Sequence, residues 1–366
     1  MKILVLPNAF KGSLSARETA RVFSRELTKL HSVRAYPISD GGDGFIDFFR
    51  MLDPQAQLIA VTAKNAFLKT KRTNFLLLSD GKTAIVETAR ICGLGNTPAH
   101  KLDPMHATSF GVGEVILKAV KQGAKTIYVG LGGVACNDGG AGMAVACGAI
   151  LLDKNNTPLP LGAKPLTEIK KITLSSLKKH FKGIKIIGVA DVTNPLLGPK
   201  SSAKVFGPQK GASPTQVKEL DKAMSAFARA IKKETGKNIS DKASTAAAGA
   251  IGAGLMGCFG AQLLLGSDFL VKKTNLEKEI KWADLVITTE GKLDKQTFYG
   301  KAPLAVLKLA KKQKKPVLFV CGKLEEKALK NQPFSPQKIA VLTDFSSPEE
   351  TQKNAAKFIR RICKTI

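Results

Sequence analysis

Short apolar runs alternate along this chain with segments whose apolar residues recur every three or four positions. The runs are continuous, as in strands buried on both faces of a sheet, and the spaced segments are typical of amphipathic helices. The predicted strands cover residues 3–6, 33–38, 126–131, 184–189, 283–287, 316–320 and 339–342. Strands and helices in alternation predict an α/β fold with a mostly parallel sheet.

Three serine-led signals mark where helices begin. In each, a glutamate or glutamine follows the serine by three positions, the pattern of a capping box; they are Ser15 with Glu18, Ser213 with Gln216, and Ser347 with Glu350. A further helix is expected over 110–122, ending at Gly123.

The pattern changes between about residues 55 and 86, where apolar and polar positions alternate without an intervening helix. This favours an antiparallel or mixed patch and the start of a second domain. We therefore expect one α/β domain built from residues 1–54 and 276–366, with a second α/β domain, 55–275, inserted into it. The uncharged stretch 244–267 is rich in Ala and Gly in its first half, so we expect a buried glycine-rich turn feeding a core helix rather than a membrane span.

Composition narrows the function classes. The net charge is +28, but aromatic residues are only 6% of the chain and no nucleic-acid-binding motif occurs, so we interpret the lysine runs as solvated faces and expect no specific nucleic acid. Six scattered cysteines without a C-x-x-C pair argue against zinc and disulfides and favour a reducing, cytoplasmic compartment.

Two glycine-rich loops follow predicted strands and share the pattern Asp-Gly-Gly-x-Gly. One begins at Asp40 and the other at Asp138. Paired glycines allow backbone N–H groups to surround a phosphate, and an aspartate there can act through Mg²⁺. The alternative is a tight glycine turn that the aspartate merely caps.

Other strand ends add polar groups. Residues 191–195 (Asp-Val-Thr-Asn-Pro) follow one predicted strand, residues 289–296 follow another, and Lys11 follows the first. Ligands of open α/β sheets bind at the carboxyl ends of the strands, so these groups are candidates for one chemistry.

A dehydrogenase acting on a small hydroxy acid is the alternative function. Gly130-x-Gly132-x-x-Ala135 follows a strand and Asp153 comes later, close to the NAD(P) fingerprint. That hypothesis leaves the clustered carboxylates without a role. The chain has neither a P-loop signature nor a G-x-S-x-G elbow.

In order along almost the whole chain, these loops resemble the bacterial glycerate kinase family that lacks a P-loop. The resemblance rests on Pro7–Ser13, Asp40–Gly44, Gly132–Gly142, Asp191–Leu196 and Val205–Ala212, and continues through Glu290-Gly291, Asp294, Gln296-Thr297 and Gly300-Lys301. It implies a Rossmann-like domain with an inserted α/β domain, and phosphorylation of D-glycerate that depends on ATP and Mg²⁺. A homodimer is an open alternative to a monomer.

The resemblance and the strand-end positions together assign expected roles. We expect Asp191 as base or orienting group with Lys11 and Lys210 neutralising charge, and Asp40 or Glu290 holding Mg²⁺. The choice of base and metal ligand among Asp40, Asp138, Asp191, Glu290 and Asp294 stays open. Phosphate-binding residues are expected to be Gly132, Gly133, Asn137, Asp138, Gly139 and Gly140, and substrate-binding residues Asn194, Gln209, Asp294 and Gln296. The sequence departs from the family at Asn8, usually aspartate, and at Val134 and Cys136, usually hydroxyl residues.

Overall fold

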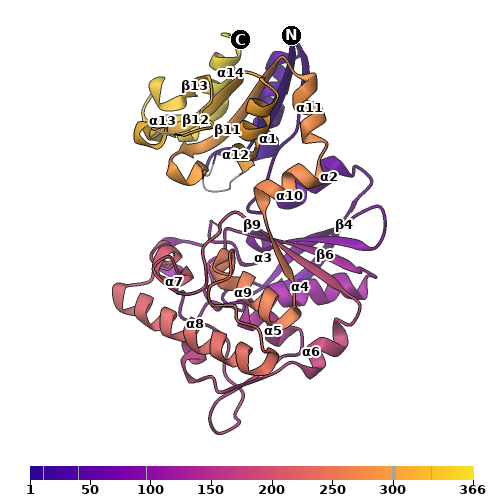
Figure 1. Cartoon of the computed structure of the whole chain (residues 1–366), viewed down its shortest axis with the longest axis vertical. Coiled ribbons are helices and arrows are strands. Elements are labelled where there is room, and N and C mark those ends of the chain that lie inside the picture. The colour runs from indigo at the N-terminus through magenta and orange to yellow at the C-terminus, as the bar shows by residue number, and fades with distance from the viewer. Residues whose placement is uncertain (11, 40, 96, 299–301, 331) are drawn as a thin grey trace. The chain divides into compact units, whose positions relative to one another are not determined.

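The computed structural model describes residues 1–10, 12–39, 41–95, 97–298, 302–330 and 332–366, and divides the chain into two compact units (Figure 1). Unit 1 consists of Met1–Leu52 and Leu265–Ile366, and unit 2 of Asp53–Leu264. The chain thus leaves unit 1 after Leu52 and returns at Leu265, whereas the sequence suggested junctions after residues 54 and 275.

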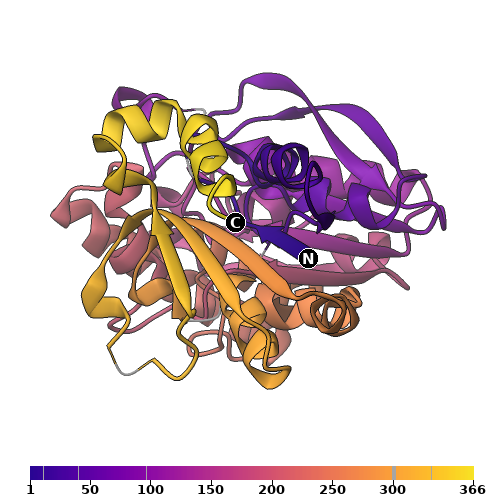
Figure 2. The same cartoon turned by 90° about the horizontal axis from the view of Figure 1, so that it is seen from above.

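Unit 1 contains a five-stranded parallel sheet in the order β13-β12-β11-β1-β2. The strands are β1 (Lys2–Pro7), β2 (Ser32–Ala35), β11 (Leu285–Leu293), β12 (Val317–Leu324) and β13 (Lys338–Val341). In Figure 2 the indigo N-terminal strand lies beside the orange strand β11, with β12 and β13 beyond it. From β1 the chain adds β2 on one side and β11 to β13 on the other, so strand order reverses between β1 and β11.

Helices flank this sheet. One group comprises α1 (Ala16–Leu27), α13 (Pro348–Lys353) and α14 (Ala355–Cys363); the other comprises α2 (Phe45–Leu52), α10 (Gly266–Lys273), α11 (Leu276–Trp282) and α12 (Ala302–Lys312). Ile3 and Val5 of β1 pack with Phe23 of α1 and Phe358 of α14 in one core cluster. The apolar side chains of α1 recur at helical spacing, which is why this helix buries one face.

Unit 2 contains a six-stranded sheet in the order β10-β9-β6-β5-β4-β3 and a separate two-stranded sheet, β7-β8. The strands are β3 (Gln57–Lys64), β4 (Thr70–Leu77), β5 (Thr83–Glu87), β6 (Thr126–Leu131), β7 (Ile150–Leu152), β8 (Lys171–Thr173), β9 (Lys185–Ala190) and β10 (Gln262–Leu265). β3, β4 and β5 pair antiparallel, whereas β5, β6 and β9 are parallel. The mixed patch expected over 55–86 is thereby confirmed.

The helices of unit 2 are α3 (Thr88–Cys92), α4 (Phe110–Lys121), α5 (Ala141–Ala146), α6 (Ser175–His180), α7 (Ser202–Phe206), α8 (Pro214–Thr235) and α9 (Ala247–Phe259). Val129 of β6 shares a core cluster with Val115 of α4, Met143 of α5 and Leu255 of α9. Residues of one parity along the strands thus bury against these helices, as the two-residue period of a strand requires.

Local signals in the sequence account for several element ends. Ser15 and Ser213 form complete capping boxes, and Ser347 accepts a hydrogen bond from the Glu350 N–H. The glycine-rich stretch after residue 244 forms the buried helix α9, which opens with three residues in left-handed conformation, Ala248, Gly249 and Ala250. No helix in the described part of the chain is long and apolar enough to cross a membrane.

Strand β11 is longer than its apolar run predicts. The run ends at Ile287, but the strand continues to Leu293. Thr288 Oγ1 donates to Leu6 O (2.9 Å) and Thr289 Oγ1 to Asn8 O (2.7 Å), so the buried hydroxyls find acceptors on the β1 side. Because these polar groups are satisfied, Glu290 lies within the strand and not in the loop after it.

Candidate functional site

In unit 1, the reversal of strand order between β1 and β11 places a crevice position at the carboxyl end of the sheet, where open α/β sheets bind ligands. Pro7 pairs with Thr289, and Glu290 pairs with Cys321 of β12. Asn8 and Glu290 are each the next residue after the Pro7–Thr289 pair, so they lie on neighbouring chain segments at the switch point. Asn8 Oδ1 accepts from the Ala9 N–H at 2.8 Å, which fixes the start of the loop that leads to residue 11.

Glu290 is a buried carboxylate, with 7% of its surface exposed. Its Oε2 accepts a hydrogen bond from Thr297 Oγ1 at 2.7 Å. The same Thr297 hydroxyl accepts from the Asp294 N–H (3.2 Å), and Thr297 N–H donates to Asp294 O (3.1 Å). The short helix Lys295–Phe298 thus holds Glu290 in place, and Asp294 lies half-buried at its start.

The donor chemistry of Glu290 suits Mg²⁺, which takes hard oxygen ligands and is commonly held by one or two carboxylates plus substrate phosphates. No cluster of three or more metal-ligating side chains occurs among the described residues. Burial raises the pKa of neighbouring Cys321 to about 12, with Asp344 and Glu290 adding to it, so this thiol stays neutral.

In unit 2, the carboxyl ends of three parallel strands bring Glu87, Gly132 and Asp191 to one edge of the sheet. Glu87 pairs with Gly130 of β6, and Gly130 with Val189 of β9, so the residues just beyond these positions lie side by side. Asp191 follows the last residue of β9 and is half-buried. The structure thus places Asp191 and the start of the 132–140 loop at the same edge of the sheet.

Four of the nine backbone N–H groups in the loop from Gly132 to Gly140 donate hydrogen bonds within the protein. Gly132 N–H donates to Thr88 Oγ1 (3.3 Å), Ala135 N–H to Cys92 O (2.8 Å), and Gly139 N–H to Gly249 O (3.1 Å). The N–H groups of Gly133, Val134, Cys136, Asn137 and Asp138 have no hydrogen-bond partner among the described residues, and of these five residues Gly133 alone is exposed. The part of the loop that can meet a phosphate is therefore narrower than the motif suggests.

Asp138 holds the loop from within. The side chain is fully buried, and its Oδ2 accepts from Thr108 Oγ1 (3.0 Å), Ser109 N (2.8 Å), Ser109 Oγ (3.0 Å) and Gly142 N (3.2 Å). Oδ1 accepts from Gly140 N at 3.2 Å. Both oxygens are thus occupied by groups at the starts of α4 and α5, and the geometry favours the capping role over that of a ligand.

Asn137 is also fully buried, and its side-chain NH₂ lacks a hydrogen-bond partner among the described residues. Its Oδ1 accepts from Ser202 Oγ at 2.9 Å, while no described group accepts a hydrogen bond from Nδ2. Ser202 opens α7, so this contact ties the loop to the segment that carries Lys210.

Lys210 is buried rather than presented at the surface, with 2% of its area exposed. Its Nζ donates to the backbone oxygen of Cys136 at 2.6 Å. Burial lowers the pKa of Lys210 to about 8, and the nearby Cys136 and Asp138 partly offset this. Lys210 therefore lies against the loop from the inside.

The remaining expected residues are less concentrated. Asn194 Nδ2 donates to Lys200 O at 2.9 Å, and Gln209 is exposed at the surface. Lys11 and Asp40 lie outside the described residues, as do Gly300 and Lys301 and the side chain of Gln296. The departures Val134 and Cys136 are both buried, and a hydrogen bond with Cys92 together with burial raises the pKa of the Cys136 thiol well above its usual value.

Sequence reasoning missed the pair Glu87 and Arg90 at the end of β5. Arg90 Nε donates to Glu87 Oε2 (3.3 Å) and Arg90 Nη1 to Asn74 Oδ1 (3.3 Å), while Glu87 is 4% exposed. A buried carboxylate directly after an apolar strand, with an arginine three residues later, was the available signal.

The dinucleotide fingerprint does not have its required context. Helix α5 begins only at Ala141, so Gly130, Gly132 and Ala135 do not form a tight strand-to-helix turn. Asp153 follows β7, which pairs with β8 in a separate antiparallel sheet, and its Oδ1 caps a turn by accepting from the Thr157 N–H. The acidic residue thus lies at no parallel strand end where it could bind a ribose.

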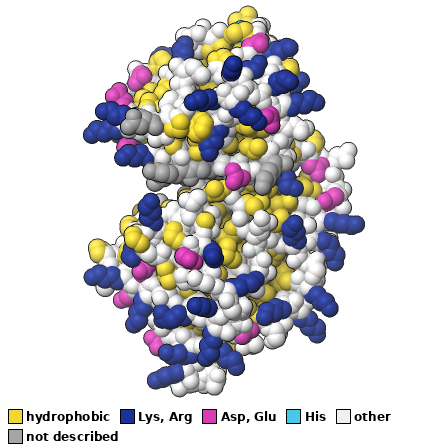
Figure 3. Space-filling view, in the orientation of Figure 1, with side chains coloured by type: hydrophobic (Ala, Val, Ile, Leu, Met, Phe, Trp, Pro, Cys, Tyr) yellow, Lys and Arg dark blue, Asp and Glu magenta, His cyan; other side chains and the backbone are white. Residues whose placement is uncertain are grey.

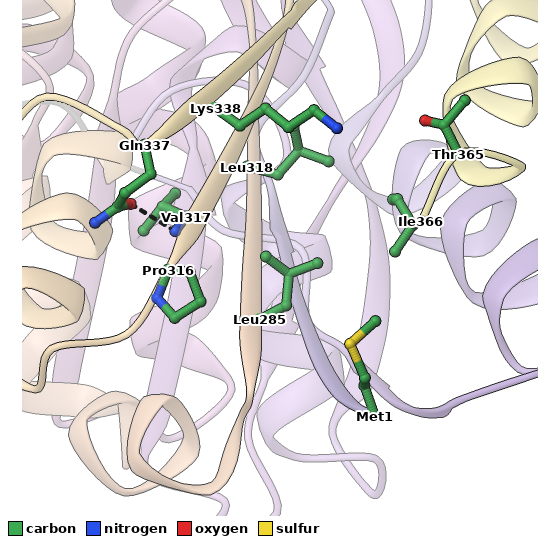
Figure 4. A pocket seen from close by; sticks show the side chains of 9 residues that line it. All are labelled: Met1, Leu285, Pro316, Val317, Leu318, Gln337, Lys338, Thr365 and Ile366. Atoms are coloured by element: carbon green, nitrogen blue, oxygen red, sulfur yellow. Dashed lines mark hydrogen bonds between the residues drawn. The ribbon is translucent and has the colours of Figure 1, made fainter.

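Two other surface features lie apart from these strand ends. Lys and Arg side chains are spread over the visible face in Figure 3, and the paired lysines 178–179 and 232–233 are exposed, as expected. Figure 4 shows a cavity of about 240 Å³ lined by Met1, Leu285, Pro316, Val317, Leu318, Gln337, Lys338, Thr365 and Ile366. Leu285, Val317 and Lys338 begin their strands, so this cavity is at the amino edge of the unit 1 sheet, opposite Glu290.

Known proteins resemble the chain over its whole length. The model of the glycerate kinase family matches residues 3–366. Glycerate 2-kinase of Escherichia coli (strain K12) is 37% identical over 370 residues, covering 100% of this chain and 97% of the relative. Glycerate kinase of Bacillus subtilis (strain 168) is 34% identical over 371 residues, again covering 100% and 97%.

A solved structure described as glycerate kinase 2 of Salmonella typhimurium LT2 superposes with a TM-score of 0.79 at 33% identity, covering 100% of this chain and 98% of that one. The α/β architecture and the ordered strand-end motifs agree with these matches. The chain therefore belongs to the glycerate kinase family.

Proposed function

We propose that this protein transfers the γ-phosphate of ATP to D-glycerate. The observation that carries the proposal is the placement of Asp191 beside the 132–140 loop, in a chain that matches glycerate kinases from end to end. A kinase of this kind needs groups that position two anions and offset their charge, because phosphoryl transfer is catalysed mainly by positioning and electrostatics. We place the reaction in the cytoplasm, where ATP is available.

Each residue has a defined task in this proposal. The N–H groups of Gly133 and Val134 donate to phosphate oxygens, since neither has a described internal acceptor and Gly133 is the exposed residue of the loop. Asp191 orients the glycerate hydroxyl and accepts its proton as the new O–P bond forms and the bond to the ADP oxygen breaks. Lys11 offsets the charge of the anionic substrates.

Glu290, with Asp40, would hold Mg²⁺, which neutralises charge on the phosphates when bound. Asn194, Gln209, Asp294 and Gln296 remain candidates for contacts with glycerate.

Purified protein mixed with ATP, Mg²⁺ and D-glycerate should form ADP. A coupled assay measures the ADP formed. Phosphorus NMR identifies the product; the name of the Escherichia coli relative supports 2-phosphoglycerate over the 3-isomer. A parallel reaction with NAD(P)⁺ and small hydroxy acids tests the dehydrogenase alternative. Hydride transfer without ADP above background would overturn the proposal.

Asp191→Asn tests the central residue. We expect kcat to fall by about 10²–10⁴-fold, the usual contribution of a positioned proton acceptor, with the melting temperature and the KM for ATP near those of the native protein. Asp241→Asn is the matched control, because Asp241 is an exposed aspartate of the same unit. Near-native turnover of the Asp191 variant would refute its role.

A further inference from the structure

The ammonium of Lys210 is enclosed where three chain segments meet. Lys210 ends the short helix Pro208–Lys210, and its Nζ donates to Cys136 O in the loop after β6. No described carboxylate lies within ion-pair distance of Nζ. The contact is therefore directed at the loop backbone and not at a neighbouring acid.

The third segment is the left-handed turn that opens α9. Gly249 has φ +61°, and a Cβ there would overlap Cys136 O and lie 2.7 Å from Lys210 Nζ. Gly249 O also accepts from the Gly139 N–H at 3.1 Å. The Cys136 carbonyl is thus held between an ammonium and a glycine that has no room for a side chain.

This arrangement fixes the peptide between Cys136 and Asn137, two residues after the N–H groups that we assign to phosphate. It also places a buried positive charge near the buried Asp138 carboxylate, which acts on Lys210 electrostatically. Buried charges are costly unless they are compensated, so an ammonium kept here without a carboxylate contact needs a reason.

We propose that Lys210 is a positioning residue, which holds the Cys136 carbonyl so that the Gly133–Asp138 stretch keeps its ligand-binding conformation, and which does not itself touch the substrates. This rests on the proposed kinase activity. It changes the expectation that Lys210 neutralises substrate charge directly.

The proposal links activity to pH in one direction. Among the described residues, the titratable groups that act on Lys210 are Cys136 and Asp138, both on the loop, and burial outweighs them, giving a pKa of about 8 against an ordinary 10.5. Above pH 8 the neutral amine makes a weaker hydrogen bond, so kcat/KM should fall several-fold. Between pH 8 and 10.5 the unfolded chain keeps the proton that the folded chain has lost, so this group makes unfolding free energy rise with pH. Activity and this contribution to stability thus move in opposite directions.

The test measures kcat/KM from pH 6.5 to 9.5 for the native protein and for Lys210→Met, Lys210→Arg and Lys204→Met. Lys204 is the matched control, because it lies in the same segment but is exposed. We expect Lys210→Met to lower kcat/KM by about 10- to 100-fold, corresponding to about 1.4–2.8 kcal/mol. Both Lys210 variants should lose the decline above pH 8, since neither side chain titrates there. Lys204→Met should keep it.

A second arm uses Gly249→Ala, which crowds the same carbonyl. Lys210→Met combined with Gly249→Ala should lose little more activity than the worse single variant, because both act on one contact. Additive losses, or a native-like pH profile in Lys210→Met, would overturn the proposal. If the variants fail to fold, the pH dependence of the native protein tests the proposal. A fall in kcat/KM through pH 8 without a fall in the urea midpoint supports the proposal, and a flat kcat/KM profile overturns it. Absence of ADP formation at every pH would refute the kinase function instead.

Discussion

Replacing Asp138 by Asn separates an internal role of this carboxylate from a role in binding phosphate or metal. In the native protein Oδ2 accepts from four groups and Oδ1 from Gly140 N. An asparagine can place its oxygen where Oδ2 lies, but its NH₂ then faces the Gly140 N–H. Two buried donors are left without an acceptor, and the charge near Lys210 is lost.

The expected cost follows from these contacts. An unsatisfied buried donor costs about 1–3 kcal/mol, so Asp138→Asn should destabilise the protein by about 3 kcal/mol. For a unit of this size, that lowers the melting temperature by about 6–12 °C. Circular dichroism during heating and urea unfolding measure the loss, and Asp241→Asn, at an exposed position, should be near-neutral.

The decisive comparison is between stability and ligand binding. When the variant is assayed well below its unfolding transition, its KM values for ATP and Mg²⁺ should stay close to those of the native protein, although its melting temperature is lower. A melting temperature within about 2 °C of native, together with a large rise in the KM for ATP or Mg²⁺, would refute the internal role. Asp138 would then be a ligand whose hydrogen bonds in the apo protein matter little.

Two further substitutions test the loop and the unit 1 strand end. Gly142→Ala should lower the melting temperature by several degrees, because its Cβ would overlap Thr108 Oγ1 and lie 2.9 Å from Asp138 Oδ2; a shift under 1 °C would contradict this packing. Glu290→Gln should raise the Mg²⁺ concentration for half-maximal activity by about tenfold or more, measured by Mg²⁺ titration at saturating ATP, because it removes a carboxylate ligand charge. Glu219→Gln, at an exposed site on α8, serves as its control, and an unchanged Mg²⁺ requirement would exclude Glu290 as a ligand.

Much of the fold could be predicted from local patterns. The apolar runs located β1, β6 and β9 to within a residue or so, and the serine caps marked the starts of α1 and α8. Periodicity and capping depend on neighbours within a few positions, which is why one chain suffices to recognise them. The end of β11 was missed because Thr288 and Thr289 find their acceptors on Leu6 of β1 and on Asn8 just after it, far away in sequence.

The candidate site likewise has features that the sequence predicts and features that only the folded chain decides. The sequence alone indicated which loops follow parallel strands, and hence that Asp191 and the glycine-rich loop share one sheet edge. It could not separate the members of that loop, since Asp138 and Gly133 belong to the same motif. Tertiary structure decides between them: Thr108 and Ser109 donate to Asp138 Oδ2, Lys210 donates to the Cys136 carbonyl, and the exposed Gly133 has an N–H without a described internal acceptor. Hydrogen-bond partners that lie tens of residues apart are chosen by packing, so only the folded chain determines which groups are used internally and which can bind a ligand.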